Sequence, residues 1–168
     1  MDGKDLFDPG SIGRIVPATE NLQTVIAESK FSPQAIPGKV SLVGFSVGGA
    51  GVLSYGTMLK DQVSAVVAYY PAITTMGRNM ETLAAGLQTP VLLFAGEKDL
   101  YYNCCLIHTM RELAKAPKTV PFELVGYPKA HHGFNIQSLP FAYRPEDAAD
   151  SWARTVAFLN RLHPPCAK

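Results

Sequence analysis

Four short apolar runs, separated by segments of helical periodicity, constrain the fold of this chain more than any other feature. They cover residues 40–45, 65–69, 91–95 and 122–125. Apolar runs of this length are typical of strands that are buried on both faces of a sheet. Strands that alternate with helices predict an α/β fold, with about four parallel strands, flanking helices and right-handed crossovers.

The segments between the runs place apolar residues three or four positions apart, which indicates helices. The segments predicted to be helical are residues 19–30, 52–59, 78–85, 103–113 and 145–159. Thr19 and Asn103 are suitable N-caps, and Pro145 suits a first helical turn. Residues 1–18, rich in Gly and Pro, are predicted to be irregular. The last helix carries one apolar stripe, formed by Ala148, Trp152, Val156 and Leu159.

Length and charge narrow the class of protein. A chain of 168 residues with 47% apolar residues is expected to form one globular domain over residues 1–168. Fifteen basic and fourteen acidic side chains nearly cancel, so charge gives no reason to expect nucleic acid or an anionic membrane as partner. No apolar run approaches the length of a membrane span, and the polar residues 1–5 do not fit a secretory signal. We therefore expect a cytoplasmic protein.

Motifs for cofactors and metals are missing. The sequence has no glycine-rich phosphate loop, no dinucleotide fingerprint and no His-Glu-x-x-His pair. Cys104 and Cys105 are adjacent, and neighbours in sequence rarely meet disulfide geometry. We predict that they are reduced, lie in the first turn of a helix and have a structural role. His108 and His163 are expected at the surface. No cofactor or metal is predicted.

The sharpest motif is Gly44-Phe45-Ser46-Val47-Gly48-Gly49, at the end of the first predicted strand. A serine between glycines at a strand-to-helix junction is typical of a nucleophile elbow, in which the hydroxyl is exposed. The N–H of Val47 could then bind an oxyanion. The alternative is a glycine-rich turn that serves close packing alone.

Candidate partners for Ser46 follow the third and fourth strands. Asp99 comes after residues 91–95, and His132 comes after residues 122–125. Serine, carboxylate and histidine appear in the order that α/β-hydrolases use, and all three fall at carboxyl ends of parallel strands. We therefore predict a Ser46-His132-Asp99 triad. From the residues alone, Glu97 remains an alternative to Asp99, and His131 an alternative to His132.

Aromatic residues gather around these positions. Tyr69, Tyr70, Tyr101 and Tyr102 lie at strand ends, and Phe134 follows the two histidines. They are predicted either to line an acyl or alcohol pocket or to serve ordinary packing. Our candidates for substrate binding are Tyr70, Tyr102 and Phe134.

With the triad in place, the chain resembles the dienelactone hydrolase family of α/β-hydrolases over residues 19–162. The matching pieces are Gly44-Phe45-Ser46-x-Gly48-Gly49, Tyr70-Pro71, Gly96-x-x-Asp99, Tyr127-Pro128-x-Ala130-x-His132-Gly133-Phe134 and residues 147–159. The resemblance implies that His132, before the Gly-Phe pair, is the catalytic histidine. The chain departs from the family's pattern at Ser46, because the enzymes after which the family is named have a cysteine at this position. This suits the family's serine carboxylesterases better than a hydrolase of cyclic dienelactones.

Only 39 residues precede Val40, whereas a complete α/β-hydrolase has about four strands before its elbow. We therefore expect a truncated, minimal α/β-hydrolase. The resemblance implies a serine carboxylic ester hydrolase that forms an acyl-enzyme with a small-molecule ester. The alternative function is a catalytically impaired remnant that binds a ligand or a partner.

The truncation also predicts an assembly. In chain order, right-handed crossovers put the helices after Ser46, Tyr70 and Asp99 on one face of the sheet. The last helix alone is then expected to cover only part of the other face of the sheet, and the first strand keeps an unpaired edge. We therefore expect a homo-oligomer, most simply a twofold dimer, that buries this edge or face.

Overall fold

In a computed structural model, residues 15–74 and 79–162 form four strands and five α-helices. The strands are β1 (Val40–Phe45), β2 (Val63–Tyr69), β3 (Val91–Gly96) and β4 (Phe122–Tyr127). The helices are α1 (Ile15–Ser29), α2 (Val47–Ser54), α3 (Met80–Gly86), α4 (Ile107–Lys115) and α5 (Pro145–Leu162). None of these helices combines the length and apolar character that a membrane crossing requires.

The strands form one sheet in the order β1-β2-β3-β4, and every neighbouring pair is parallel. The predicted α/β class and the four-stranded parallel sheet are confirmed. β2 begins two residues earlier than the apolar run, at Val63, and β4 extends two residues further, to Tyr127. Both extensions pair with neighbouring strands, with Val63 opposite Val40 and Tyr127 opposite Gly96. Backbone pairing therefore extends the two strands past Ser64 and Gly126, which interrupt the apolar runs in the sequence.

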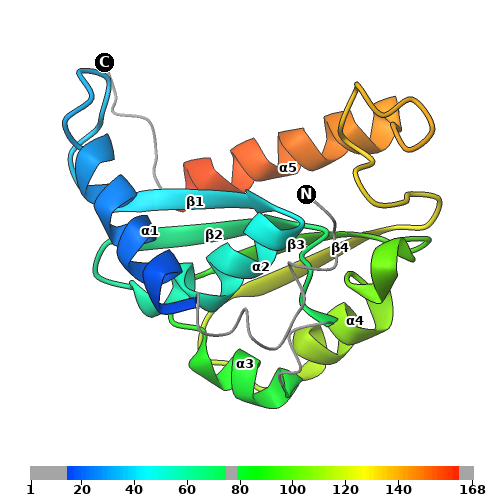
Figure 1. Cartoon of the computed structure of the whole chain (residues 1–168), viewed down its shortest axis with the longest axis horizontal. Coiled ribbons are helices and arrows are strands. Elements are labelled where there is room, and N and C mark those ends of the chain that lie inside the picture. Colours follow the sequence, from blue (N-terminus) through cyan, green and yellow to red (C-terminus); the bar gives the residue numbers. More distant parts are fainter. Residues whose placement is uncertain (1–14, 75–78, 163–168) are drawn as a thin grey trace.

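Two separate apolar cores lie on the two faces of the sheet. One contains Leu53 of α2, Leu83 of α3 and Met110 of α4, together with Ile26 of α1. The other contains Phe158 of α5, packed with aromatic residues of β2 and β3. Figure 1 shows α2, α3 and α4 below the sheet and α5 above it. The expectation that the helices after Ser46, Tyr70 and Asp99 share one face is confirmed.

The first helix begins earlier than predicted. It starts at Ile15 rather than at Thr19, so residues 15–18 are helical and not irregular. Pro17 falls in the first turn, where a missing backbone N–H breaks no intrahelical hydrogen bond. The expectation for residues 1–14 lies outside the described part of the chain.

The helix around α4 also begins elsewhere than predicted. Asn103 lies in a separate 3₁₀ turn, Tyr101–Asn103, and α4 starts only at Ile107, with Leu106 as its N-cap residue. The positive φ of Asn103, 53°, is incompatible with a continuous helix. Cys104 therefore does not lie in a helical first turn. In α3 the N-cap is Asn79, whose Oδ1 accepts from two backbone N–H groups. Residue 78, the predicted start, is outside the described residues.

Helix α5 turns a different stripe toward the sheet. Its buried residues are Ser151, Thr155 and Phe158, whereas Trp152 is 60% exposed and Val156 is 41% exposed. The cause is Tyr69 of β2, whose hydroxyl lies 2.7 Å from Thr155 Oγ1 and donates to the carbonyl of Ser151 at 3.1 Å. A buried hydroxyl needs such partners, so the polar residues face inward.

Candidate active site

The loops after the four strands meet at one edge of the sheet, because parallel strands share the direction of their carboxyl ends. Among the described residues, the non-glycine residues with positive φ are Ser46, Tyr70, Tyr102 and Asn103. All of them lie in the loops after β1, β2 and β3. A backbone of this kind costs about 1–3 kcal/mol at each residue and gathers at functional sites. The strain therefore marks this edge as the candidate site.

Ser46 forms the turn between β1 and α2, with φ 52° and ψ −118°. Its backbone N–H donates to the carbonyl of Tyr69 at 3.0 Å. Its own carbonyl accepts from the N–H groups of Ala50 and Ala72, each at 3.0 Å. These three hydrogen bonds tie the strained turn to both α2 and the end of β2, and so fix the position of the hydroxyl.

Close contact between β1 and α2 explains why the motif contains glycine. A Cβ on Gly44 would lie 2.4 Å from the carbonyl oxygen of Gly48, which is a severe clash with backbone. A Cβ on Gly49 would lie 3.1 Å from Cα of Pro71. On Gly48, by contrast, a Cβ would meet nothing within 4 Å. Gly44 is therefore required by the tight turn, whereas Gly48 is not required by space.

His132 connects Ser46 to Asp99. Its Nε2 lies 2.9 Å from Oγ of Ser46, and its Nδ1 lies 2.8 Å from Oδ2 of Asp99. The side chain of Asp99 is fully buried, and that of His132 is 16% exposed. A proton on Nδ1 is donated to the carboxylate, which leaves the lone pair of Nε2 to accept from the serine hydroxyl. The three side chains thus form one hydrogen-bonded row.

The two alternatives left open by the sequence lie elsewhere. Glu97 Oε1 accepts from Nη2 of Arg111 at 2.7 Å in a partly exposed ion pair. His131 is exposed. The structure therefore brings Asp99 and His132 together with Ser46, and it directs Glu97 toward Arg111. His108 is exposed on α4, as expected, and His163 lies outside the described residues.

Tyr101 supports the row from two sides. Its backbone N–H donates to Oδ1 of Asp99 at 3.0 Å. Its ring stacks on the imidazole of His132, with centroids 4.5 Å apart and planes 11° apart. The sequence placed Tyr101 only in a general group of tyrosines. Its position two residues after Asp99 is the signal that could have singled it out, because a loop carboxylate commonly accepts from an N–H two residues on.

The three residues predicted to bind substrate differ in exposure. Phe134 is fully buried and Tyr70 is 1% exposed, so both rings pack behind the site. The rings of Tyr70 and His132 meet edge to face with their centroids 4.7 Å apart, and the hydroxyl of Tyr70 donates to Oδ1 of Asn135 at 2.8 Å. Burial is the main cause that raises the pKa of Tyr70 above its ordinary value. Tyr102 is 69% exposed and is the one of the three at the surface.

Val47 is the first residue of α2, directly after Ser46. Backbone N–H groups in the first turn of a helix have no intrahelical acceptor, and the helix dipole there favours negative charge. This N–H is therefore suited to stabilise an oxyanion that forms beside Ser46.

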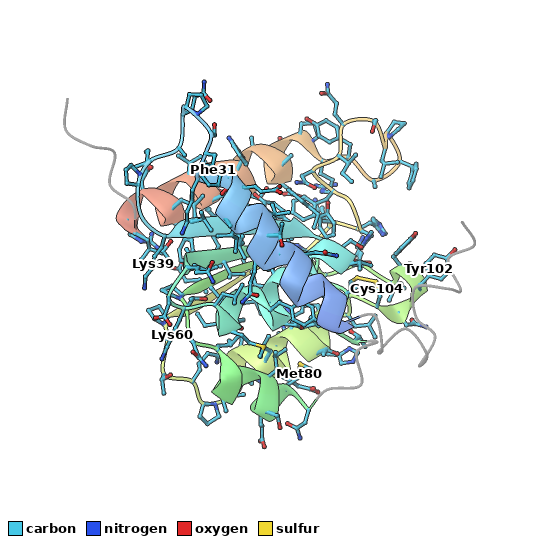
Figure 2. The ribbon with its side chains drawn as sticks, turned by 60° about the vertical axis from the view of Figure 1, so that its left-hand side comes forward. Phe31, Lys39, Lys60, Met80, Tyr102 and Cys104 are labelled. Atoms are coloured by element: carbon cyan, nitrogen blue, oxygen red, sulfur yellow. A yellow bond between two sulfur atoms is a disulfide. The ribbon has the colours of Figure 1, made fainter. Side chains whose placement is uncertain are left out.

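The two adjacent cysteines are not reduced thiols. Cys104 and Cys105 are joined by a disulfide, and both are buried. The prediction that neighbours in sequence would not pair is therefore wrong. The irregular backbone of this segment is the physical reason: Cys104 follows the positive-φ residues Tyr102 and Asn103, and it precedes α4 rather than lying within it. Figure 2 shows Cys104 and Tyr102 on the same side of the molecule.

The fold is similar to solved structures of hydrolases. A candidate dienelactone hydrolase from Klebsiella pneumoniae subsp. pneumoniae is 25% identical, with a TM-score of 0.70 over 83% of this chain and 58% of that one. A dienelactone hydrolase-like promiscuous phosphotriesterase from metagenomic libraries is 19% identical, with a TM-score of 0.67 over 91% and 64%. An esterase from Pyrococcus furiosus is 17% identical, with a TM-score of 0.63 over 86% and 61%.

This chain thus spans 58% to 64% of the length of those three structures and matches part of the α/β-hydrolase fold. Among curated proteins, no sequence matches it significantly. The sequence does match the model of the dienelactone hydrolase family, over residues 10–163. That match covers all four strands, the turn at Ser46 and the loop that carries His132. The chain therefore belongs to the dienelactone hydrolase family.

Proposed function

We propose that this chain hydrolyses small carboxylic esters through a covalent acyl-enzyme formed on Ser46. The observation that carries the proposal is the row from Asp99 through His132 to Ser46, with distances of 2.8 and 2.9 Å. A serine nucleophile needs a base at hydrogen-bond distance and an orienting carboxylate behind the base. Membership of a hydrolase family supports the same chemistry.

In this mechanism Oγ of Ser46 bonds to the ester carbonyl carbon while Nε2 of His132 takes the hydroxyl proton. The carbonyl oxygen becomes an oxyanion and accepts from the N–H of Val47. Nε2 then gives its proton to the leaving alcohol as the ester C–O bond breaks. A water molecule, deprotonated by Nε2, attacks the acyl-serine, and the acid leaves as Oγ regains its proton. Asp99 holds the tautomer and stabilises the imidazolium.

Replacement of the nucleophile tests this function. Ser46→Ala should lower the rate of hydrolysis of p-nitrophenyl acetate by about 10⁴-fold or more, because only the binding and oxyanion contributions remain. Ser32→Ala changes an exposed serine in the loop after α1 and is the matched control. It should keep the full rate. Circular dichroism of both variants should match the wild type. Turnover by Ser46→Ala at the wild-type rate would refute the proposal.

One observation favours a second function, a hydrolase remnant that binds a ligand or partner without turnover. β1 is an edge strand in the described sheet, and α/β-hydrolases take their second oxyanion N–H from a loop beyond that edge. Loss of one such donor costs about 10²–10³ in rate. In this case the wild type would show no burst and no turnover of p-nitrophenyl esters of any chain length, although it is folded.

We also infer that the chain forms a homodimer through the apolar side of β1. On α5, Asp150 accepts from the hydroxyl of Tyr127, and Arg161 pairs with Glu123, so that flank of the helix faces β4. The opposite flank carries the exposed Trp152 and Val156. It therefore faces the β1 side of the sheet.

On that side of the sheet, Val43 and Phe45 are 38% and 42% exposed. They share the face of Val67 and Tyr69, which they pair with on β2 and which belong to the core under α5. Within the described residues β1 pairs with β2 alone and is an edge of the sheet. An apolar face beside such an edge is a surface that proteins normally cover. A twofold contact between two β1 strands would cover both at once.

A further inference from the structure

The disulfide-bonded cysteines lie beside the imidazole of the candidate active site. The two Sγ atoms and one ring nitrogen of His132 all lie within 4.8 Å of one another. Cys104 and Cys105 are 1% and 0% exposed. They come from the loop after β3, whereas His132 comes from the loop after β4. The ester hydrolysis proposed above makes no use of either sulfur.

Reduction would turn this cluster into a set of soft ligands. A dithiol reductant supplies two electrons and two protons to the disulfide and becomes a disulfide itself. A phosphine supplies two electrons and becomes a phosphine oxide, while one water molecule supplies its oxygen and the two protons. Either reductant converts the Cys104–Cys105 disulfide into two thiols. Two thiolates and a neutral imidazole are the ligands that Zn²⁺ and similar thiophilic cations prefer. In a tetrahedral zinc site such ligand atoms stand roughly 3.5–3.8 Å apart, given bonds of about 2.0–2.3 Å. The cluster is already compact enough that only small side-chain shifts are needed.

The surroundings of His132 also suit a metal ligand. Nδ1 is hydrogen-bonded to Oδ2 of Asp99 at 2.8 Å, and Oδ1 of Asp99 is held by the N–H of Tyr101. A ligating histidine almost always gives its second N–H to a carboxylate or carbonyl in this way. With Nδ1 so engaged, the lone pair available to a cation is the one on Nε2. In the metal-free protein that lone pair faces the hydroxyl of Ser46.

We propose that reduction of the Cys104–Cys105 disulfide creates a site for a thiophilic divalent cation such as Zn²⁺, held by both thiolates and His132. Binding releases the two thiol protons, and a water molecule completes the coordination. The consequence for activity rests on the proposed function: a cation on Nε2 removes the base that Ser46 needs. The chain would then hydrolyse esters in its metal-free or disulfide form and be inhibited by the cation in its reduced form.

Cobalt is the probe for binding, because thiolate-bound Co²⁺ absorbs strongly in the near ultraviolet. The full chain, treated with a phosphine reductant and freed of metal, should bind one Co²⁺ with this absorption, and excess Zn²⁺ should remove it. The same chain with its disulfide intact should bind at least about 100-fold more weakly, since both thiolates are lost. Equal binding by the two forms, or none by a form whose thiols are shown to be reduced, would overturn the proposal.

Variants assign the ligands. Cys105→Ser and His132→Asn should each weaken Co²⁺ binding by more than about 100-fold, since loss of a residue that merely orients a metal ligand already costs about 10–100-fold. The matched control is His131→Asn, which changes the exposed neighbouring histidine and should bind like the wild type. If Cys105→Ser fails to fold, the reduced and oxidised wild type still decide the question. Tight binding by folded His132→Asn would contradict the inference that the site includes the imidazole.

Activity separates this proposal from the proposed function. Zn²⁺ should inhibit p-nitrophenyl acetate hydrolysis by the reduced wild type, and a chelator should restore the rate. Cys105→Ser should hydrolyse the ester but resist Zn²⁺. If metal-free protein has no esterase activity while Co²⁺ still binds, the proposed function fails and the metal site stands. If Co²⁺ binds and the ester is still hydrolysed at the full rate, the coupling between the two is wrong.

Discussion

Asp99 is a fully buried carboxylate with a donor on each oxygen, the N–H of Tyr101 on one side and the imidazole of His132 on the other. A buried anion is costly unless it is hydrogen-bonded, so this carboxylate depends on both contacts. Glu97, two residues earlier, is bonded to Arg111 at the surface instead. Substitutions of these two acidic residues are therefore expected to have very different effects on activity.

Asp99→Asn should lower kcat for p-nitrophenyl acetate by about 10⁴-fold. The amide has nearly the same shape as the carboxylate, but it favours the wrong tautomer of His132. Glu97→Gln is the matched control and should stay within about threefold of the wild type, since it loses only an exposed ion pair. Steady-state kinetics of both variants, with circular dichroism as a check on folding, make the measurement. A larger loss of kcat in Glu97→Gln than in Asp99→Asn would show that Glu97, and not Asp99, is the carboxylate that orients His132.

Among the elements, β1 and α2 are joined by the tightest contact of the site, and the two glycines of that contact differ. Gly44→Ala should cost about 1–3 kcal/mol of unfolding free energy, because its Cβ would lie 2.4 Å from the carbonyl of Gly48. The shift of Ser46 should also lower the rate, by about 10²-fold for a displacement near 1 Å.

Gly48→Ala is the control for that pair, since its Cβ meets nothing within 4 Å on an exposed helical position. It should gain about 0.5–1 kcal/mol from the lower backbone entropy of the unfolded chain. Urea unfolding of both variants supplies the free energies. Equal free-energy changes for the two glycines would contradict the packing described for the elbow.

The strands could be predicted from the sequence more closely than the buried face of helix α5. Strands buried on both faces leave an apolar run, so β1 to β4 were predictable to within two residues. The buried stripe of α5 was not, because Tyr69 draws Thr155 inward through its hydroxyl while leaving Trp152 exposed. The spacing of apolar residues gives no sign of a buried hydrogen bond between Thr155 and Tyr69, which lie 86 positions apart in the sequence.

The same limit holds for the site. Ser46 and the loops that carry Asp99 and His132 could be predicted from the sequence, because their order and their places at strand ends follow from the topology. The residues alone left Glu97 and His131 as alternatives, and the family resemblance favoured His132. The stacking of Tyr101 on His132 and the approach of the cysteines to the same ring depend on how two loops fold against each other. Backbone with positive φ, as at Tyr102 and Asn103, is not specified by residue type.

For the whole molecule, the exposed apolar side of β1 predicts association. Multi-angle light scattering at micromolar concentration should give about twice the 18.1 kDa of one chain. Val43→Lys should convert this dimer to a monomer, because it places a charge in the proposed contact. Phe141→Lys replaces another exposed apolar residue, 84% exposed and outside β1, and should leave the dimer intact. A wild-type monomer would refute the proposed assembly.

If Ser46 is an activated nucleophile, it should react covalently with a fluorophosphonate. A fluorophosphonate reacts with a serine only when a neighbouring base raises the reactivity of the hydroxyl. Labelling therefore tests whether the hydrogen-bonded row from Asp99 to Ser46 activates the serine, without any assumption about the substrate. One label per folded chain is expected, located on Ser46 by peptide mass spectrometry. The label should be absent from Ser46→Ala and strongly reduced in Asp99→Asn. Failure of the folded wild type to react, or a label that persists in Ser46→Ala, would contradict the activation of Ser46.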